Sequence, residues 1–479
     1  MTSDINSIEN IHTQNIPSNC TKDNKILLIP AVELAEKIRK RQLTCEEVMK
    51  VYIERAKAVH PFVNAAVDER FDDALKDAKN IDRFLDSKTK SEEEIAKDTP
   101  LLGIPFSCKE TIGVIGMKQT SGLVRSKDHI AKVDGGAPAM YRKAGAIPFL
   151  VTDIPELCMW WESSNHVNGL TKNPYDNTRT VGGSSGGEGA VVTSASSIIG
   201  IGNDIAGSIR IPACFSGIYG HKPSRDIVPN WGVFPFCDMK PEKEDRTKDF
   251  VSTGPMCRYV QDLPLLLNVL SGNDKRLQLD TKVNFKNVKV YYLEELPGLL
   301  HAAVPDVKKS IKTAVKHFEE TYGIKAIPLQ CPELKYAFYI WESKLLEYDG
   351  PPFKFYIKGE AKKERKTIFT SLCLEKYKAI ERKFEEIFKE DAIVLIPTHP
   401  EPAPHYLMTI PMYPNIAYTC IFNVLGYPST QIPAGLSKGV PIGIQAVSGP
   451  FKDHISIATA FELDTVFNGW ISPSPISVS

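Results

Sequence analysis

Helical and strand-like patterns alternate along most of the chain. Helical signals begin near Pro30, and Thr44 with Glu47 forms a capping box before an apolar stripe. Further on, segments with helical spacing are followed by short apolar runs typical of buried strands. These pairs predict helix 137–144 with strand 146–151, 188–197 with 198–201, 260–270 with 288–292, and 377–388 with 392–396. Such alternation favours an α/β fold in which helices cover both faces of a sheet.

The two ends of this pattern set the expected domain boundaries. Residues 1–25 are polar and rich in Asn, Ser and Thr, which predicts a disordered N-terminal tail. Residues 26–479 contain no internal repeat and no convincing linker, so we expect one large domain there. Residues 351–366 are rich in Lys and Glu and are interpreted as a solvated excursion or a basic membrane-facing patch.

The first residues have no signal-peptide pattern, and no stretch approaches the roughly 20 apolar residues of a membrane span. We therefore expect an intracellular protein, either cytoplasmic or peripheral on a membrane. Lys plus Arg and Asp plus Glu both total 58, so no overall field attracts nucleic acid. The ten cysteines are scattered without a C-x-x-C pair, which favours reduced thiols over a metal site or a disulfide framework.

Residues 182–189 read GGSSGGEG and lead directly into small and apolar residues with helical potential. This is typical of a glycine-rich turn that enters a helix. A phosphate-binding P-loop is disfavoured because Glu188, not Lys, follows Gly187. The run also fits the G-x-S-x-G nucleophile elbow of α/β-hydrolases, with Ser185 as nucleophile, or Ser184 in the overlapping frame. That alternative needs a histidine base, for which the sequence offers His399, His405 and His454.

Residues 202–212 (GNDIAGSIRIP) place Ser208 in a tight loop of small residues after an apolar run. Such a loop can direct several consecutive backbone N–H groups at one point, which is what an oxyanion hole requires. Ser208 at its end could then attack a carbonyl group held there.

A serine nucleophile needs a base. Residues 101–106 predict a buried strand, and Lys109 follows it. A salt bridge with Glu110 or Asp204 is the plain interpretation of this lysine. Burial at the end of an apolar strand would instead lower its pKa, because the charged amine loses its hydration, and a neutral amine can accept a proton.

Together these segments resemble the amidase signature family, and within it they look most like the fatty-acid amide hydrolases, type 2 in particular. The resemblance covers nearly all residues from about 25 to 470. Its motifs are GIPFSCK (103–109), NPYD (173–176), GGSSGGEG (182–189), DIAGSIR (204–210), GHKPS (220–224), TGPMCR (253–258) and PIGIQ (441–445). The family's fold is one large domain with a twisted mixed sheet between helices.

The resemblance also implies residue roles. Lys109 matches the base, Ser184 matches a serine that follows a cis peptide and relays the proton, and Ser208 matches the residue that forms the acyl-enzyme. The backbone of the oxyanion hole corresponds to Ile205, Ala206, Gly207 and Ser208. The supporting polar positions correspond to Ser185, Asp204 and Arg210. The chemistry uses no metal and no organic cofactor.

Several positions depart from the family pattern. Ala206 replaces a usual glycine and would be strained if its φ were positive, and Asn203 replaces a hydroxyl or small residue. The N-terminal membrane helix common in fatty-acid amide hydrolases is not seen, and the region 349–374 is shorter and more charged than their membrane-capping insert. Residues 157–161 (LCMWW) resemble a stretch that lines the acyl pocket, and also suit an ordinary core.

The expected activity is hydrolysis of carboxylic amides, small-molecule and lipid-like, with fatty acyl amides as the favoured substrates. Two alternatives stay open: an α/β-hydrolase-type esterase that uses Ser185 and a histidine, and a catalytically degenerate relative that only binds lipid or a partner. Nucleic acid is not an expected partner. Peripheral membrane contact and a homodimer remain open.

Overall fold

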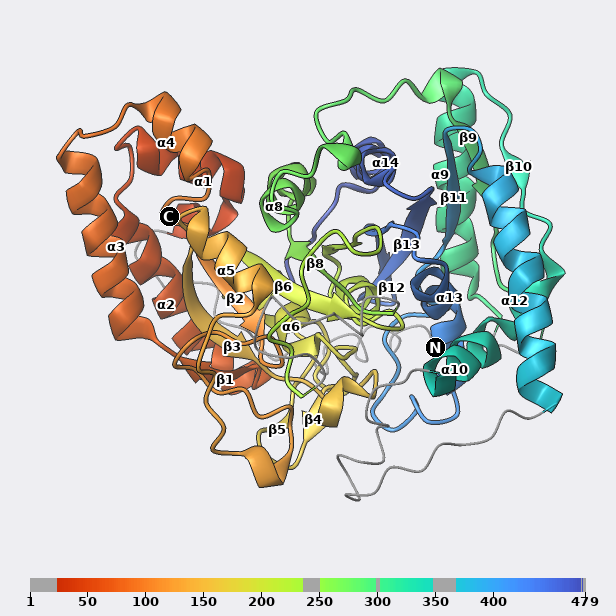
Figure 1. Cartoon of the computed structure of the whole chain (residues 1–479), viewed down its shortest axis with the longest axis horizontal. Coiled ribbons are helices and arrows are strands. Elements are labelled where there is room, and N and C mark those ends of the chain that lie inside the picture. The colour runs from red at the N-terminus through yellow and green to blue at the C-terminus, as the bar shows by residue number, and fades with distance from the viewer. Residues whose placement is uncertain (1–23, 236–249, 299–301, 348–367, 475, 477–479) are drawn as a thin grey trace, which may run out of the picture.

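The computed structural model describes residues 24–235, 250–298, 302–347, 368–474 and 476. Within them, an eleven-stranded sheet runs through the middle of the molecule, with helices around it (Figure 1). The strand order is β1-β3-β2-β6-β8-β7-β12-β13-β11-β9-β10. Pairing is mixed, since β3, β2 and β6 are parallel neighbours, β6 to β11 pair antiparallel, and β11, β9 and β10 are parallel. The predicted α/β class with a mixed sheet in one large domain is confirmed.

The strands of this sheet are β1 (Ala66–Glu69), β2 (Pro105–Lys109), β3 (Ile147–Thr152), β6 (Ile199–Asp204), β7 (Tyr219–Lys222), β8 (Ser252–Cys257), β9 (Lys289–Tyr292), β10 (Ile327–Pro328), β11 (Ala392–Pro397), β12 (Ser429–Ser437) and β13 (Val440–Ser448). A separate hairpin pairs β4 (Ser164–Asn165) with β5 (Gly169–Leu170). The described α-helices are α1 (Ala31–Arg39), α2 (Cys45–Val63), α3 (Phe71–Asp86), α4 (Glu92–Asp98), α5 (Gly136–Lys143), α6 (Gly186–Thr193), α7 (Arg210–Phe215), α8 (Leu263–Leu270), α9 (Pro305–Tyr322), α10 (Ala337–Glu347), α12 (Ile368–Ile387), α13 (Ala417–Leu425) and α14 (Asp453–Phe467).

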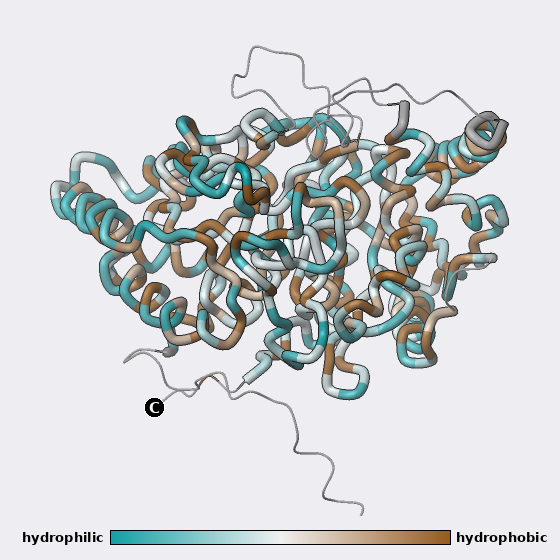
Figure 2. Tube along the Cα trace, turned by 90° about the horizontal axis from the view of Figure 1, so that it is seen from below, coloured by the Kyte–Doolittle hydropathy of each residue, from teal (hydrophilic) through white to brown (hydrophobic). Residues whose placement is uncertain are grey.

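Both faces of the sheet are buried, as β11 illustrates. Ile393 and Leu395 belong to one apolar core with residues of α9 and α14, whereas Val394 and Ile396 belong to another with residues of α10 and α13. Successive side chains of a strand point to opposite faces, so a continuous apolar run indicates cover on both sides. The outer helix α3, at the left edge of Figure 2, is in contrast mostly hydrophilic.

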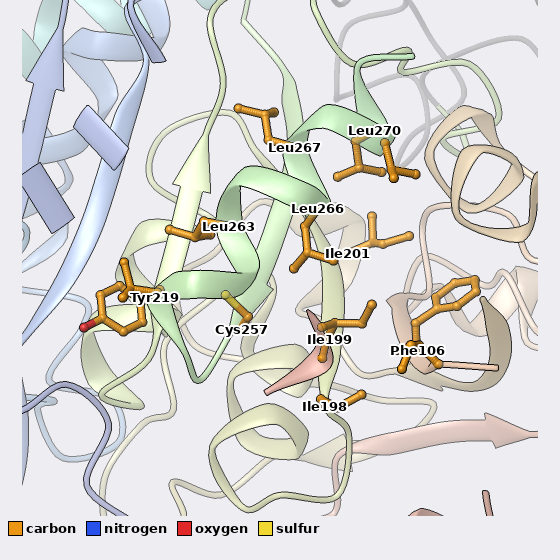
Figure 3. Packing of buried hydrophobic residues seen from close by; sticks show 14 of the residues in the cluster. Phe106, Ile198, Ile199, Ile201, Tyr219, Cys257, Leu263, Leu266, Leu267 and Leu270 are labelled. Atoms are coloured by element: carbon orange, nitrogen blue, oxygen red, sulfur yellow. The ribbon is translucent and has the colours of Figure 1, made fainter. Parts of the chain in front are cut away.

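Apolar packing holds the central strands in place. Figure 3 shows Leu263, Leu266, Leu267 and Leu270 of α8 in the same cluster as Ile199 and Ile201 of β6 and Phe106 of β2. These side chains are almost completely inaccessible to water. Full burial of one leucine or isoleucine stabilises the fold by about 1.5–3 kcal/mol, so β2 and β6 are fixed firmly relative to each other.

Some helices and strands begin or end at other residues than the sequence predicted. The capping box of Thr44 and Glu47 is present at the start of α2. The strand predicted at 101–106 is instead β2, Pro105–Lys109, because Gly103 (φ +80°) turns the chain before it. The helix predicted at 188–197 is α6, Gly186–Thr193. Gly187 in its first turn lies so close to the backbone of Asp153 that a Cβ would be 2.4 Å from the Asp153 nitrogen. Glycine is needed here for close approach rather than for a turn.

The ends of the chain bear on two further expectations. Residues 1–23 of the predicted disordered tail and the whole Lys- and Glu-rich stretch 351–366 lie outside the described residues. Asn24 and Lys25, placed in the tail by the sequence, begin a 3-10 helix, Asn24–Leu28. Among the described helices, none combines the length and apolar character required to cross a membrane.

Candidate active site

The predicted catalytic residues come from the carboxyl edge of two parallel neighbours, β2 and β6. Lys109 is the last residue of β2, and Asp204 is the last residue of β6. Ser184 lies in the turn just before α6, and Ser208 lies in the loop just before α7. Because parallel strands end at the same edge of a sheet, Lys109 and the loop with Ser208 converge there. The hydrogen bond between Lys109 and Ser184 brings the turn before α6 to the same place.

Lys109 is completely buried, and its amine contacts Ser184. Nζ donates to the Ser184 Oγ at 2.6 Å and to the Asn203 carbonyl oxygen at 3.3 Å. Burial disfavours the charged amine and lowers the pKa of Lys109 below the usual lysine value. A neutral amine has a lone pair that can accept the proton of a serine hydroxyl.

The salt-bridge interpretation of Lys109 is wrong. Among the residues that the structure describes, its amine forms no ion pair. Glu110 accepts hydrogen bonds from the Thr120 hydroxyl and from the backbone of Thr120 and Gly122. Asp204 pairs with Arg210 instead.

The two serine loops are tied together through Ser185. Its backbone N–H donates to the Ser208 carbonyl oxygen (3.1 Å), and its Oγ donates to the Asn203 carbonyl oxygen (3.3 Å). The Gly183–Ser184 peptide bond is cis. Within the described part of the chain, no hydrogen bond joins the hydroxyls of Ser184 and Ser208. Ser208 is 7% exposed and lines a pocket, whereas Ser184 is fully buried beneath it.

The loop between β6 and α7 exposes backbone donors to that pocket. Asp204 Oδ1 accepts the N–H of Gly207 at 2.6 Å, so this N–H is already used. In the described structure, the N–H groups of Ile205, Ala206 and Ser208 donate to no protein acceptor, and all three residues line the pocket. Three of the four positions predicted for an oxyanion hole are therefore free to bind a ligand oxygen.

The expected strain at Ala206 is absent, since its φ is not positive. Gly207 is the residue of this loop with a positive φ, +125°. A Cβ there would also lie 2.2 Å from the Thr419 Oγ1, so glycine is required for both reasons.

Asp204 and Arg210 form a fully buried ion pair that organises the loop. Arg210 Nε lies 3.0 Å from Asp204 Oδ2, and its Nη2 lies 3.0 Å from Oδ1. Burial alone would raise the pKa of the Asp204 carboxyl, but the charge and hydrogen bonds of Arg210 outweigh it and hold this pKa well below its usual range. The carboxylate stays ionised and can accept the backbone N–H groups of Gly207 and Ile209.

The pocket above Ser208 is narrow and mostly apolar. Its volume is about 30 Å³, and Trp160, Trp341 and Tyr413 contribute to its wall. The Trp160 and Tyr413 rings stack with centroids 5.0 Å apart. The segment 157–161, expected beside an acyl pocket, contributes Cys158 to Trp161 to this lining. In the described residues, no group of three His, Cys, Asp or Glu side chains could hold a metal ion.

Sequence patterns missed several residues that surround this edge. Glu188 is completely buried next to β2, accepts hydrogen bonds from Ser107 and Thr152, and has a pKa raised to about 8 by burial. Thr419 and Asn423 of α13 hydrogen-bond to carbonyl oxygens of the β6–α7 loop. Glu188 lies within the motif at 182–189, but its burial and its partners were not predicted. No local motif marks Thr419 and Asn423, because they reach the site only through tertiary packing.

The α/β-hydrolase alternative offered His399, His405 or His454 as base. His399 Nδ1 contacts the Glu401 carbonyl oxygen. The Ser185 hydroxyl donates to a backbone carbonyl, and in the described structure no hydrogen bond connects it to a histidine. His405 contacts Thr178, and His454 contacts the Leu277 carbonyl oxygen.

Comparisons with known proteins agree with this geometry. The family model described as "Amidase" matches residues 47–348 and 350–456. The chain is 39% identical to fatty-acid amide hydrolase 2 of Homo sapiens, with 94% of this chain and 91% of that protein covered. It is 37% identical to fatty-acid amide hydrolase 2-A of Danio rerio, with 95% and 92% covered.

Solved structures have the same fold. A fatty acid amide hydrolase superposes with a TM-score of 0.76 at 24% identity, covering 95% of this chain and 87% of that one. An amidase crystal structure gives a TM-score of 0.76 at 22% identity, covering 92% and 100%. With its family model, its relatives and its fold in agreement, the chain belongs to the amidase signature family of amide-cleaving hydrolases.

Proposed function

We propose that this protein hydrolyses fatty acyl amides through an acyl-enzyme on Ser208, with Ser184 as proton relay and Lys109 as base. The observation that carries the proposal is the buried hydrogen bond of 2.6 Å between the Lys109 amine and the Ser184 hydroxyl, next to Gly183, which lines the same pocket as Ser208. A buried amine with a lowered pKa next to a hydroxyl is a physically reasonable proton acceptor.

The proposed reaction begins when neutral Lys109 takes the Ser184 proton while Ser184 takes the proton of Ser208. The Ser208 Oγ attacks the amide carbon, and the oxyanion accepts hydrogen bonds from the free N–H groups of the loop. The amine leaves with the proton returned through Ser184, because an amide anion is a very poor leaving group. Water then cleaves the Ser208 ester by the same proton path. The two hydroxyls must approach to hydrogen-bond distance when substrate binds.

The apolar pocket wall supports an apolar acyl group as the bound portion. Its volume of about 30 Å³ is far below that of a long acyl chain, so the wall of the pocket must open when such a chain binds. The relatives named fatty-acid amide hydrolase 2 support the same substrate class. Peripheral contact with a membrane and a homodimer remain predictions.

The test is to incubate the protein with primary amides and ethanolamides of C2 to C18 acyl groups and to detect the free acids by mass spectrometry. Ser208→Ala should abolish turnover, and Ser310→Ala on α9, which removes a hydroxyl bonded only to the local helix backbone, should not. A fluorophosphonate should label Ser208 in the wild type.

Three results would contradict the proposal. Folded wild-type protein that neither turns over any amide nor labels at Ser208 would favour a binding protein without catalysis. Turnover that survives Lys109→Ala but is lost on a single histidine change would favour the α/β-hydrolase mechanism. Turnover restricted to short acyl groups would contradict the substrate class alone.

A further inference from the structure

The loop between β6 and α7 has an unusual distribution of hydrogen bonds. Five consecutive carbonyl oxygens each accept a hydrogen bond: Asp204 from Asn423 Nδ2 (2.8 Å), Ile205 from Trp341 Nε1 (2.9 Å), Ala206 from Thr419 Oγ1, Gly207 from the Ile211 N–H (2.7 Å) and Ser208 from the Ser185 N–H (3.1 Å). In the described structure, three N–H groups of the same loop have no acceptor. The loop is thus held from its carbonyl side, and the three residues whose N–H groups have no acceptor all line the pocket.

A carbonyl contact of this kind determines where the next N–H points. The peptide unit is planar, and in a trans peptide the C=O and the following N–H point in opposite directions. A hydrogen bond to the Ile205 oxygen therefore sets the direction of the Ala206 N–H. That N–H is one of the three free donors in the pocket.

We propose that Trp341 is a positioning residue for the oxyanion hole, a proposal that rests on the function proposed above. Trp341 belongs to α10 and is 3% exposed. Its ring lines the pocket, and its indole N–H donates to the Ile205 carbonyl oxygen. It holds the Ile205–Ala206 peptide plane so that the Ala206 N–H meets the oxyanion that forms when Ser208 attacks.

Thr419 and Asn423 also donate to carbonyl oxygens of this loop, but with different effects. Thr419 holds the peptide of Gly207, whose N–H already donates to Asp204. Asn423 also bonds to the Asp204 carboxylate and to Arg210, so its removal would disturb the buried ion pair. Of these three described side-chain contacts, only that of Trp341 orients an N–H group without an acceptor and leaves the Asp204–Arg210 ion pair untouched.

Trp341→Phe removes the donor and keeps an aromatic ring in the pocket wall. We expect kcat for a saturating acyl amide to fall about tenfold, as for loss of one hydrogen bond, with KM nearly unchanged. A trifluoromethyl ketone with the same acyl chain forms an oxyanion on Ser208, so its affinity should fall by the same factor. The affinity of the product fatty acid, measured as an inhibitor, should stay within twofold.

Trp470→Phe is a matched control, because this indole also donates to a backbone carbonyl, that of Thr193 at the end of α6. It should leave kcat and inhibitor affinity unchanged. If Trp341→Phe does not fold, replacement of Trp341 by benzothienylalanine, which has the same shape without an N–H, provides the same comparison.

Wild-type kcat and ketone affinity in a folded Trp341 variant would overturn this inference, and so would a rise in KM with kcat unchanged, which would indicate only a pocket-wall role. A wild-type protein without amide turnover and without Ser208 labelling would instead overturn the proposed function. The two failures are therefore distinguishable.

Discussion

Removal of the Arg210 side chain from the buried ion pair should strongly destabilise the fold. Arg210→Met preserves an unbranched apolar stem but deletes the guanidinium that contacts both carboxylate oxygens of Asp204 at 3.0 Å. The same guanidinium donates to Gln445 Oε1 (3.0 Å) and Asn423 Oδ1 (2.7 Å), so the change leaves three acceptor groups short of a partner.

The expected cost follows from burial. Asp204 is inaccessible to water, and an uncompensated buried charge of this kind costs about 3–5 kcal/mol. Total stabilities of folded domains are about 5–15 kcal/mol, so the variant would lose a large fraction of its stability at pH 7. An exposed pair offers the matched control: Arg276, whose side chain is 56% exposed, contacts Asp274, and Arg276→Met should cost far less than Arg210→Met.

The cost should also depend on pH. In the wild type the pKa of Asp204 lies below its unfolded value, so the ionised carboxylate stabilises the fold above pH of about 4, and this contribution is lost as the pH falls through the folded pKa. In Arg210→Met the guanidinium no longer opposes burial, and the pKa of Asp204 should rise above the unfolded value. The free energy difference between wild type and variant should therefore shrink as the pH falls from 7 toward 4.

Urea unfolding followed by tryptophan fluorescence, between pH 4.5 and 8, measures this difference. The double variant Asp204→Asn/Arg210→Met removes the orphaned charge and should be more stable at pH 7 than Arg210→Met alone. The reasoning is refuted if Arg210→Met costs less than about 1 kcal/mol at pH 7, or if the double variant is the less stable of the two.

Three further perturbations have definite expected outcomes. Lys109→Met should lower kcat by about 10²- to 10⁴-fold. Wild-type kcat/KM should rise with pH through a pKa below the usual lysine value, because only the neutral amine accepts a proton. A pH–rate profile without this rise would contradict the assignment of Lys109 as base. Gly207→Ala should lower kcat about 100-fold and reduce the melting temperature, because its Cβ would lie 2.2 Å from the Thr419 Oγ1. Gly435→Ala, at a position that also has a positive φ (+90°) but open space around it, should retain activity. Glu188→Gln should gain in melting temperature relative to wild type as pH rises from 5 to 8. Burial raises the folded pKa of Glu188 to about 8, so its ionisation in the unfolded chain opposes folding over that range. A melting-temperature difference between variant and wild type that stays constant across this range would refute that pKa.

Patterns local to the chain predicted much of the architecture. The capping box at Thr44 marks the start of α2, and the continuous apolar run of β11 correctly indicated a strand buried on both faces. Helical and strand periodicities depend on side-chain directions within a few residues, so they can be detected without knowledge of the fold. Boundaries differ where the fold adds tertiary contacts: α6 begins at Gly186, two residues before the predicted start, and Gly187 in its first turn lies against the backbone of Asp153.

The sequence by itself indicated the residue types at the site: a lysine at the end of an apolar strand, a serine after a glycine-rich turn and a second serine in a tight loop. Tertiary structure decided what these groups contact. Lys109 could have paired with Glu110 or Asp204, and packing instead buried its amine against Ser184. The Trp341 contact with the oxyanion loop spans 136 residues of sequence. Periodicity and motif spacing act over a few residues, whereas hydrogen bonds between distant segments depend on the packing of whole helices against the sheet, which only the folded chain specifies.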